Sequence, residues 1–355
     1  MVQIKKFRMR KIIIHSVLFI VSLVTFILAL VLMKEGARPL SQVFRQSFSV
    51  DSPASALGFG WMASSVLLSG SPVAATSLSL LDAGVITPKE TFAMISGSRL
   101  GAAFIVLLIG FIYMLRGKKR DISLGVGLTS LLVTQTIYPV VLASGFLFLS
   151  RDWLGNWQIS TRSGLNSILD LFVGPLIAII QGWLPIGVLF PIGFLMIVGS
   201  LWLFDRAIPE INLQKTDLGM ISHLLYRPLV TFILGAIITT MTMSVSVSLS
   251  LLVPLSVRGF IRRENVIPYI MGANITTFVD TLVAAALLTN PAAIMVVLVQ
   301  IVSISFVCMV ILLTSYRLYV RTIEQLVRFI GKSRFHLLVY LLLIFGIPLL
   351  LIWVG

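Results

Sequence analysis

Two charged residues, Arg99 and Asp280, each lie well inside a long apolar run rather than at its end. In a membrane, a charge at that depth costs about 2.5–3.5 kcal/mol, so such residues usually face the protein interior and have a partner. We therefore predict that the two side chains form a pair. The planar guanidinium of Arg99 could bind two oxygens of an oxyanion. Alternatively, Arg99 could replace a coupling cation while Asp280 responds to protons or sodium, or the pair could be a static buried salt bridge.

Small polar residues interrupt two other apolar segments, 58–81 and 235–257, and each carries a Ser-x-Ser motif. Both are too short for two full crossings, so we interpret them as re-entrant helical hairpins with tips near 69–72 and 244–246. Hydroxyls, backbone N–H groups and helix N-termini at such tips suit an oxyanion. The alternative is that these serines bond to their own helices and allow close packing. The predicted substrate-binding residues are Ser69, Gly70, Ser71, Arg99, Ser244, Val245 and Ser246.

Amide and hydroxyl side chains at 274–277 indicate where a coupling cation could bind. Together with unwound backbone carbonyls they could complete a sodium site, although interhelical hydrogen bonds would also explain them. The predicted sodium ligands are Asn274, Thr276 and Thr277, and the full ion-coupling set is Thr76, Asn274, Thr276, Thr277 and Asp280. No P-loop or zinc motif is present, so we expect neither an ATP-driven pump nor a metal-dependent enzyme, and no cofactor beyond a sodium ion.

The composition excludes a water-soluble domain. Of the 355 residues, 58% are hydrophobic and 11% are charged, against about 25% charged in soluble domains. The net charge of +14 includes basic clusters that are typical of cytoplasmic loops. We therefore expect an integral protein of the plasma (inner) membrane with a cytoplasmic N-terminus. The expected spans, each near the 20 residues that a crossing helix needs, are 12–33, 91–115, 122–149, 185–204, 267–288, 292–316 and 337–354.

The sequence repeats itself at an offset of 175 residues, which places Ser69 on Ser244 and Gly97 on Gly272. At this offset the basic loop 116–120 falls on uncharged sequence, so the two halves are expected to be inverted, as in many secondary transporters. We predict an all-α polytopic membrane protein of two inverted-topology repeats, each with a re-entrant hairpin and a broken transmembrane helix. The expected parts are a first repeat (1–150), an extracytoplasmic loop with an interfacial or partial helix (151–182), a second repeat (183–316), and a cytoplasmic amphipathic segment with a C-terminal transmembrane helix (317–355).

Short motifs in the repeat add a resemblance. Residues 271–277 read Met-Gly-Ala-Asn-Ile-Thr-Thr, and the two tips read Leu-Ser-Gly-Ser (68–71) and Met-Ser-Val-Ser (243–246). This pattern resembles the type II sodium/phosphate cotransporter family, which has Gly-Ala-Asn-Ile-Gly-Thr-Thr on a broken helix and Gln-Ser-Ser-Ser tips. Both glutamines are absent here, and Arg99 stands where the family has asparagine. The resemblance implies sodium-coupled phosphate symport by alternating access.

Other functions stay open at this point. The same scaffold could carry a different anion or a lipid-linked phosphate, with Arg99 and Asp280 replacing sodium coupling. A membrane enzyme acting on lipid phosphates would need a nucleophile with an acid/base pair at an aqueous boundary, and the loops offer no such cluster. A channel is a further alternative. We expect a non-enzyme whose partners are a small inorganic anion, first of all phosphate, and membrane lipids, with no nucleic acid; an oligomer is compatible with the sequence.

Overall fold

The structure is a computed structural model that describes residues 2–42, 50–116, 120–150, 184–207, 227–257, 261, 263–288 and 290–355. Within these residues every regular element is helical, and seven helices are long and apolar enough to cross a bilayer. This agrees with the expected all-α polytopic membrane protein. The seven candidate spans are Ile14–Leu40, Pro88–Leu115, Ile122–Ser150, Ile186–Phe204, Glu264–Leu287, Pro291–Gly331 and Arg334–Val354.

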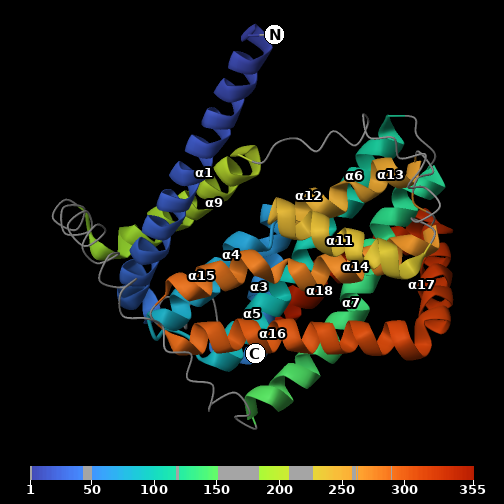
Figure 1. Ribbon diagram of the computed structural model, residues 1–355. Coiled ribbons are helices and arrows are strands. Elements are labelled where there is room, and N and C mark those ends of the chain that lie inside the picture. Colours follow the sequence, from blue (N-terminus) through green and yellow to red (C-terminus); the bar gives the residue numbers. More distant parts are fainter. Residues whose placement is uncertain are drawn as a thin grey trace.

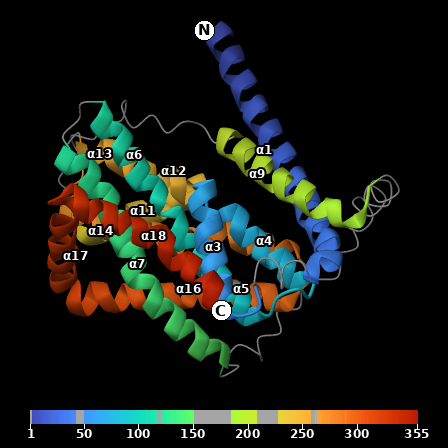
Figure 2. The ribbon, with the colours of Figure 1, turned by 180° about the vertical axis from the view of Figure 1, so that it is seen from behind.

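Helices α1 (Val2–Ala37) and α9 (Leu189–Ala207) pack along each other and project beyond the remaining helices, with the N-terminus at the outer tip of α1 (Figures 1 and 2). Their close approach depends on glycine. A Cβ built on Gly193 would lie 2.8 Å from the carbonyl oxygen of Ala29. We refer to these two helices as the α1/α9 pair.

The first hairpin consists of α3 (Pro53–Leu67) and α4 (Ser71–Asp82). The helices are separated by a turn at 68–70, in which Leu68 adopts a left-handed conformation with φ 53°. The predicted tip at 69–72 is thus within a residue of the observed turn. That the hairpin is re-entrant, rather than an ordinary helix pair, stays a prediction.

The helix that follows is interrupted at one residue, and that it is a broken transmembrane helix of a transporter repeat stays a prediction. Helix α5 (Pro88–Ala102) ends and α6 (Phe104–Leu115) begins on either side of Ala103. Helix α5 starts with a capping box, in which the side chains of Thr87 and Glu90 each accept a hydrogen bond from the other's backbone N–H. Helix α7 (Arg120–Ser150) then completes the first half.

The second half has the same order of elements. Helix α11 (Pro228–Thr242) ends at Met243, which is left-handed with φ 46°, and is followed by α12 (Val245–Ser250) and α13 (Leu252–Val257). The second arm of this hairpin is therefore two short helices rather than one. The broken helix consists of α14 (Arg263–Thr276) and α15 (Phe278–Leu287), with Thr277 at the break.

The two halves also share packing contacts at the offset of 175 residues. A Cβ on Gly60 of α3 would meet the carbonyl of Met94 on α5, and one on Gly235 of α11 would meet the carbonyl of Tyr269 on α14. A second pair of close approaches follows the same offset: Gly97 against Leu57, and Gly272 against Phe232. Each half therefore packs its first hairpin helix on its broken helix through equivalent glycines. The inverted relation of the halves stays a prediction.

The C-terminal part begins with α16 (Pro291–Val310), which passes through a π-helical turn (Ile311–Ser315) into α17 (Tyr316–Gly331). Helix α17 leaves the axis of α16 at this turn (Figures 1 and 2). It buries Val320 and Ile323 and exposes Arg321, which fits the predicted amphipathic segment. Helix α18 (Arg334–Val354) packs on α3. The predicted partial helix at 164–181 lies outside the described residues.

Candidate functional site

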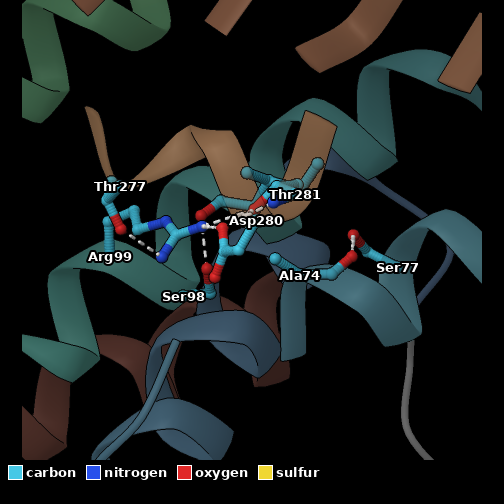
Figure 3. Close-up of polar contacts among 8 residues, drawn as sticks. Ala74, Ser77, Ser98, Arg99, Thr277, Asp280 and Thr281 are labelled. Atoms are coloured by element: carbon cyan, nitrogen blue, oxygen red, sulfur yellow. Dashed lines mark hydrogen bonds and ion pairs between the residues drawn. The ribbon is translucent and has the colours of Figure 1, made fainter. Parts of the chain in front are cut away.

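Arg99 lies in the last turn of α5, four residues before the break, and only 4% of its surface is exposed. Its guanidinium reaches the first turn of α15, in the other half of the chain (Figure 3). Nη1 donates to the hydroxyl of Thr277 at 2.9 Å, and Nη2 donates to the hydroxyl of Thr281 at 2.7 Å. The guanidinium carbon lies 4.7 Å from the ring centroid of Phe278, which adds a cation–π contact. One side chain thus joins the two broken helices.

The predicted pair with Asp280 is present. Nη2 of Arg99 lies 3.7 Å from Oδ1 of Asp280, too far for a direct hydrogen bond. Thr281 bridges the gap, because its hydroxyl accepts from Arg99 and donates to Asp280 Oδ1 at 2.8 Å. Sequence reasoning missed Thr281. It lies four residues after Thr277 and therefore on the same helix face, a spacing that could have revealed it.

Both members of the pair keep an unsatisfied atom. Nε of Arg99 and Oδ2 of Asp280 are buried and have no hydrogen-bond partner among the described residues. An unpaired buried polar atom costs about 1–3 kcal/mol, so native structures keep few of them, and each one calls for an explanation. A salt bridge that served only stability would be expected to satisfy both atoms. The arrangement therefore leaves each charged group able to bind one further partner.

The first hairpin turn adjoins the Arg99 end of the pair. A Cβ built on Gly70 would lie 2.8 Å from the carbonyl oxygen of Ser98 and 3.3 Å from Nη1 of Arg99, so this close approach depends on glycine. Ser69 and Ser71 flank Gly70 and are half-buried, and neither hydroxyl makes a hydrogen bond within the described part of the chain. The structure thus brings the first predicted tip to the predicted arginine.

The second hairpin turn adjoins the Asp280 end, but its serine is engaged. Met243 and Asp280 line the same cavity. Ser244 is the N-cap of α12 and accepts from the backbone N–H of Val247 at 3.3 Å. Val245 is buried, and the side chain of Ser246 lies outside the described residues. The two turns therefore flank the ion pair from opposite ends, with different chemistry.

Asp280 lines a cavity of about 40 Å³ between the α1/α9 pair and the second turn. The volume admits a single water molecule. The other walls include Phe26, Leu201 and Val283, together with Ser22 and Ser200. Both serine hydroxyls donate to carbonyls of their own helices. Among the described lining residues, the carboxylate is therefore the one charged group of a mostly apolar cavity.

The predicted sodium ligands point to different partners. Asn274 donates from Nδ2 to the hydroxyl of Thr134 on α7 at 3.4 Å, and Thr276 donates to the carbonyl of Ala236 on α11 at 3.0 Å. The hydroxyl of Thr277 accepts from Arg99, which places a positive charge where a cation would bind. Among the described residues there is also no group of three His, Cys, Asp or Glu side chains that could hold a metal ion. Each of the three residues is thus engaged with a different helix, and their joint use as sodium ligands stays a prediction.

Thr76, a member of the predicted ion-coupling set, and Ser248, a further hydroxyl residue of the second hairpin, both have hydrogen-bond partners within the protein. Thr76 donates to the carbonyl of Pro72 at 2.7 Å, one turn earlier in α4. Ser248 accepts from Thr239 at 2.7 Å and shares a hydrogen bond with the hydroxyl of Tyr269 at 3.0 Å. Both residues thus follow the packing interpretation of membrane serines and threonines.

No protein-family model, curated protein or solved structure matches the chain. The resemblance to sodium/phosphate cotransporters therefore rests on the sequence motifs alone. Inferences about function depend on those motifs and on the geometry around Arg99.

Proposed function

We propose that this chain is a secondary active transporter of a small oxyanion, with phosphate as the first candidate, and that it works by alternating access of two inverted repeats. The observation that carries the proposal is one buried guanidinium, Arg99, held between the broken helices of both halves and beside the first hairpin turn. A guanidinium matches two oxygens of a phosphate, and Nε of Arg99 is a donor without a partner among the described residues.

The first turn supplies the neutral donors that an oxyanion needs. Ser69 and Ser71 offer unbonded hydroxyls, and the N-terminus of α4 has Gly70 as its N-cap, without a capping side chain. Uncapped N–H groups and the helix dipole stabilise negative charge at that end. The anion would bind between this turn and Arg99 without a second fixed charge.

Alternating access needs two parts that move against each other around the site. The shared glycine packing at the 175-residue offset supports a repeat, and the match of the basic loop 116–120 to uncharged sequence supports its inversion. The Asp280 cavity lies at the boundary between the α1/α9 pair and the second turn, where such motion would open or close access to the pair.

Two coupling mechanisms compete, and the geometry favours the one without sodium. The resemblance implies sodium, but Arg99 already donates to Thr277, and Asn274 and Thr276 have other partners. An oxyanion on Arg99 would draw the guanidinium from Asp280 and leave the carboxylate without a counter-ion in an apolar cavity. An uncompensated buried charge is strongly destabilising, so the proposal makes Asp280 the group that takes up a co-transported proton together with the anion. Anion and proton would move together.

The test is uptake of ³²P-labelled phosphate by the purified chain in liposomes, under an inward proton gradient, an inward sodium gradient, or neither. We expect saturable uptake that the proton gradient accelerates. Replacing Arg99 with Ala should abolish it, whereas Lys89→Ala, which removes an exposed charge from the same helix, should not. Acceleration by sodium alone would favour the mechanism implied by the resemblance. Absent or non-saturable phosphate uptake would contradict phosphate transport, and hydrolysis of lipid phosphates would favour an enzyme.

A further inference from the structure

A second and larger cavity, of about 200 Å³, lies where α17 packs against α7 and α14. It shares no lining residue with the Asp280 cavity. Its lining includes Gly125 and Thr129 from α7, Ile267 from α14, and Glu324, Val327 and Arg328 from α17. The transport proposal assigns no role to this cavity.

The cavity carries two opposite charges that do not neutralise each other. Glu324 and Arg328 lie four residues apart on α17 and thus on one face, the spacing at which ion pairs usually form on helices. No ion pair joins them, and neither has another hydrogen-bond or ion-pair partner within the described residues. Glu324 is partly buried and Arg328 is exposed. A ligand with both a negative and a positive group would match the two side chains at once.

The remaining walls are apolar. The apolar lining residues include Val126, Ile267 and Val327. The hydroxyl of Thr129 donates a hydrogen bond to the carbonyl oxygen of Gly125 at 2.7 Å. Beside the two charges, the cavity therefore offers mainly apolar contacts to the carbon atoms of a ligand.

Helix α17 has the character of an interfacial helix. Besides the face packed into the bundle, it exposes the apolar side chains of Leu318 and Phe329. Four basic residues lie between positions 317 and 332, the last of them directly after the end of the helix. Basic helices with exposed apolar side chains lie at the boundary between lipid headgroups and acyl chains. The cavity is thus placed where a phospholipid headgroup could reach it.

We propose that this cavity binds the headgroup of a zwitterionic phospholipid with a primary amine, of the phosphatidylethanolamine type. Arg328 binds the phosphate, Glu324 binds the ammonium, and the glycerol backbone lies along Val126 and Ile267. A purely anionic headgroup would be repelled by Glu324. A choline headgroup has no N–H group that could donate a hydrogen bond to Glu324. Proteins usually bind choline in cages of aromatic side chains rather than on a carboxylate.

A larger side chain at Gly125 should fill the cavity without a steric clash. No atom lies within 4 Å of a Cβ built there, so a larger side chain meets open space rather than backbone. Leucine also favours the helix more than glycine does. Gly125→Leu should therefore fill the cavity without disturbing α7.

The experiment measures which lipids the detergent-purified full chain retains, by native mass spectrometry with phosphatidylethanolamine, phosphatidylcholine and phosphatidylglycerol in competition. We expect retention of the ethanolamine lipid to exceed that of the others by about tenfold, the effect of one net charge-assisted contact. Glu324→Gln and Gly125→Leu should each abolish this preference. The control is Arg321→Gln, which removes a charge from α17 outside the cavity and should leave the preference unchanged.

Several results would overturn the proposal. One such result is equal retention of the three lipids by the unaltered chain. The other is a preference for the ethanolamine lipid that persists in both the Glu324→Gln and the Gly125→Leu variants. Soluble phosphoethanolamine tests the source of the headgroup. If it binds as tightly as the lipid, the ligand is a soluble zwitterion and the lipid assignment is wrong.

Discussion

Equivalent positions in the two halves carry side chains that differ in charge and in hydrogen bonding. Arg99 and Asn274 occupy the same place in the repeat, 175 residues apart, just before the break in each broken helix. Each side chain crosses to the other half: Arg99 to Thr277 on the second broken helix, and Asn274 to Thr134 on α7. The shared backbone thus places two side chains at the interface of the halves, but only one is charged. The two halves thus share the order of their helices, but the side chains at equivalent positions differ in charge.

The turns differ in the same way. Gly70 and Val245 are equivalent by offset, yet Gly70 has no room for a side chain because it lies against the carbonyl oxygen of Ser98, while Val245 buries one. Within the described part of the chain the hydroxyls of the serines beside Gly70 make no hydrogen bond, whereas Ser244 caps a helix. Both differences favour the first turn over the second as the place where the proposed anion would bind.

Arg99→Asn gives both halves an asparagine at this position of the repeat, and it should have the largest effect on phosphate uptake. It removes the guanidinium that is proposed to donate two charge-assisted hydrogen bonds to phosphate, each worth about 1.5–3 kcal/mol, so we expect phosphate uptake to fall by at least about 100-fold. Uptake into liposomes measures this, with Lys89→Ala as the control.

The same substitution leaves Asp280 as an uncompensated buried charge, which is strongly destabilising. The double variant Arg99→Asn/Asp280→Asn removes both charges and should recover much of the thermal stability without recovering uptake. If uptake and stability recovered together, the pair would be structural.

Gly70→Ala tests the close approach of the first turn. The added Cβ would crowd the carbonyl of Ser98, and overpacking of this kind costs about 1–3 kcal/mol. We expect uptake to fall by about tenfold, the equivalent of 1.4 kcal/mol in that range. Gly199→Ala, at a glycine of α9 with open space around its Cβ, should change neither uptake nor melting temperature.

Asp280→Asn should have a smaller and more selective effect. The variant cannot exchange a proton, so exchange of labelled for unlabelled phosphate should persist while acceleration by an inward proton gradient disappears. Exchange and gradient-driven uptake are measured on the same vesicles. An unchanged response to the proton gradient would exclude Asp280 from coupling.

Asn274→Ala should have the smallest effect. It removes one long neutral hydrogen bond to Thr134, worth about 0.5–1.5 kcal/mol. We expect uptake with and without sodium to stay near that of the unaltered chain. A selective loss of sodium dependence would instead restore Asn274 as a sodium ligand.

Much of this arrangement was readable from sequence. Apolar segments interrupted by Ser, Gly and Pro predicted both turns to within one or two residues, because helix interruption is a local property. The cost of a charge in lipid predicted the Arg99–Asp280 pair. The partners of Asn274, Thr276 and Thr277 could not be predicted, because they depend on which helix lies opposite each residue. The contact between Gly70 and Arg99 is equally a matter of tertiary packing.

The most direct test of the central claim is equilibrium binding of labelled phosphate to the purified chain, compared with the charge-free double variant Arg99→Asn/Asp280→Asn. The account predicts one saturable site in the unaltered chain and no saturable binding in the double variant, although the latter stays folded by circular dichroism. Equal phosphate binding by a folded double variant would contradict the claim that Arg99 is the anion site.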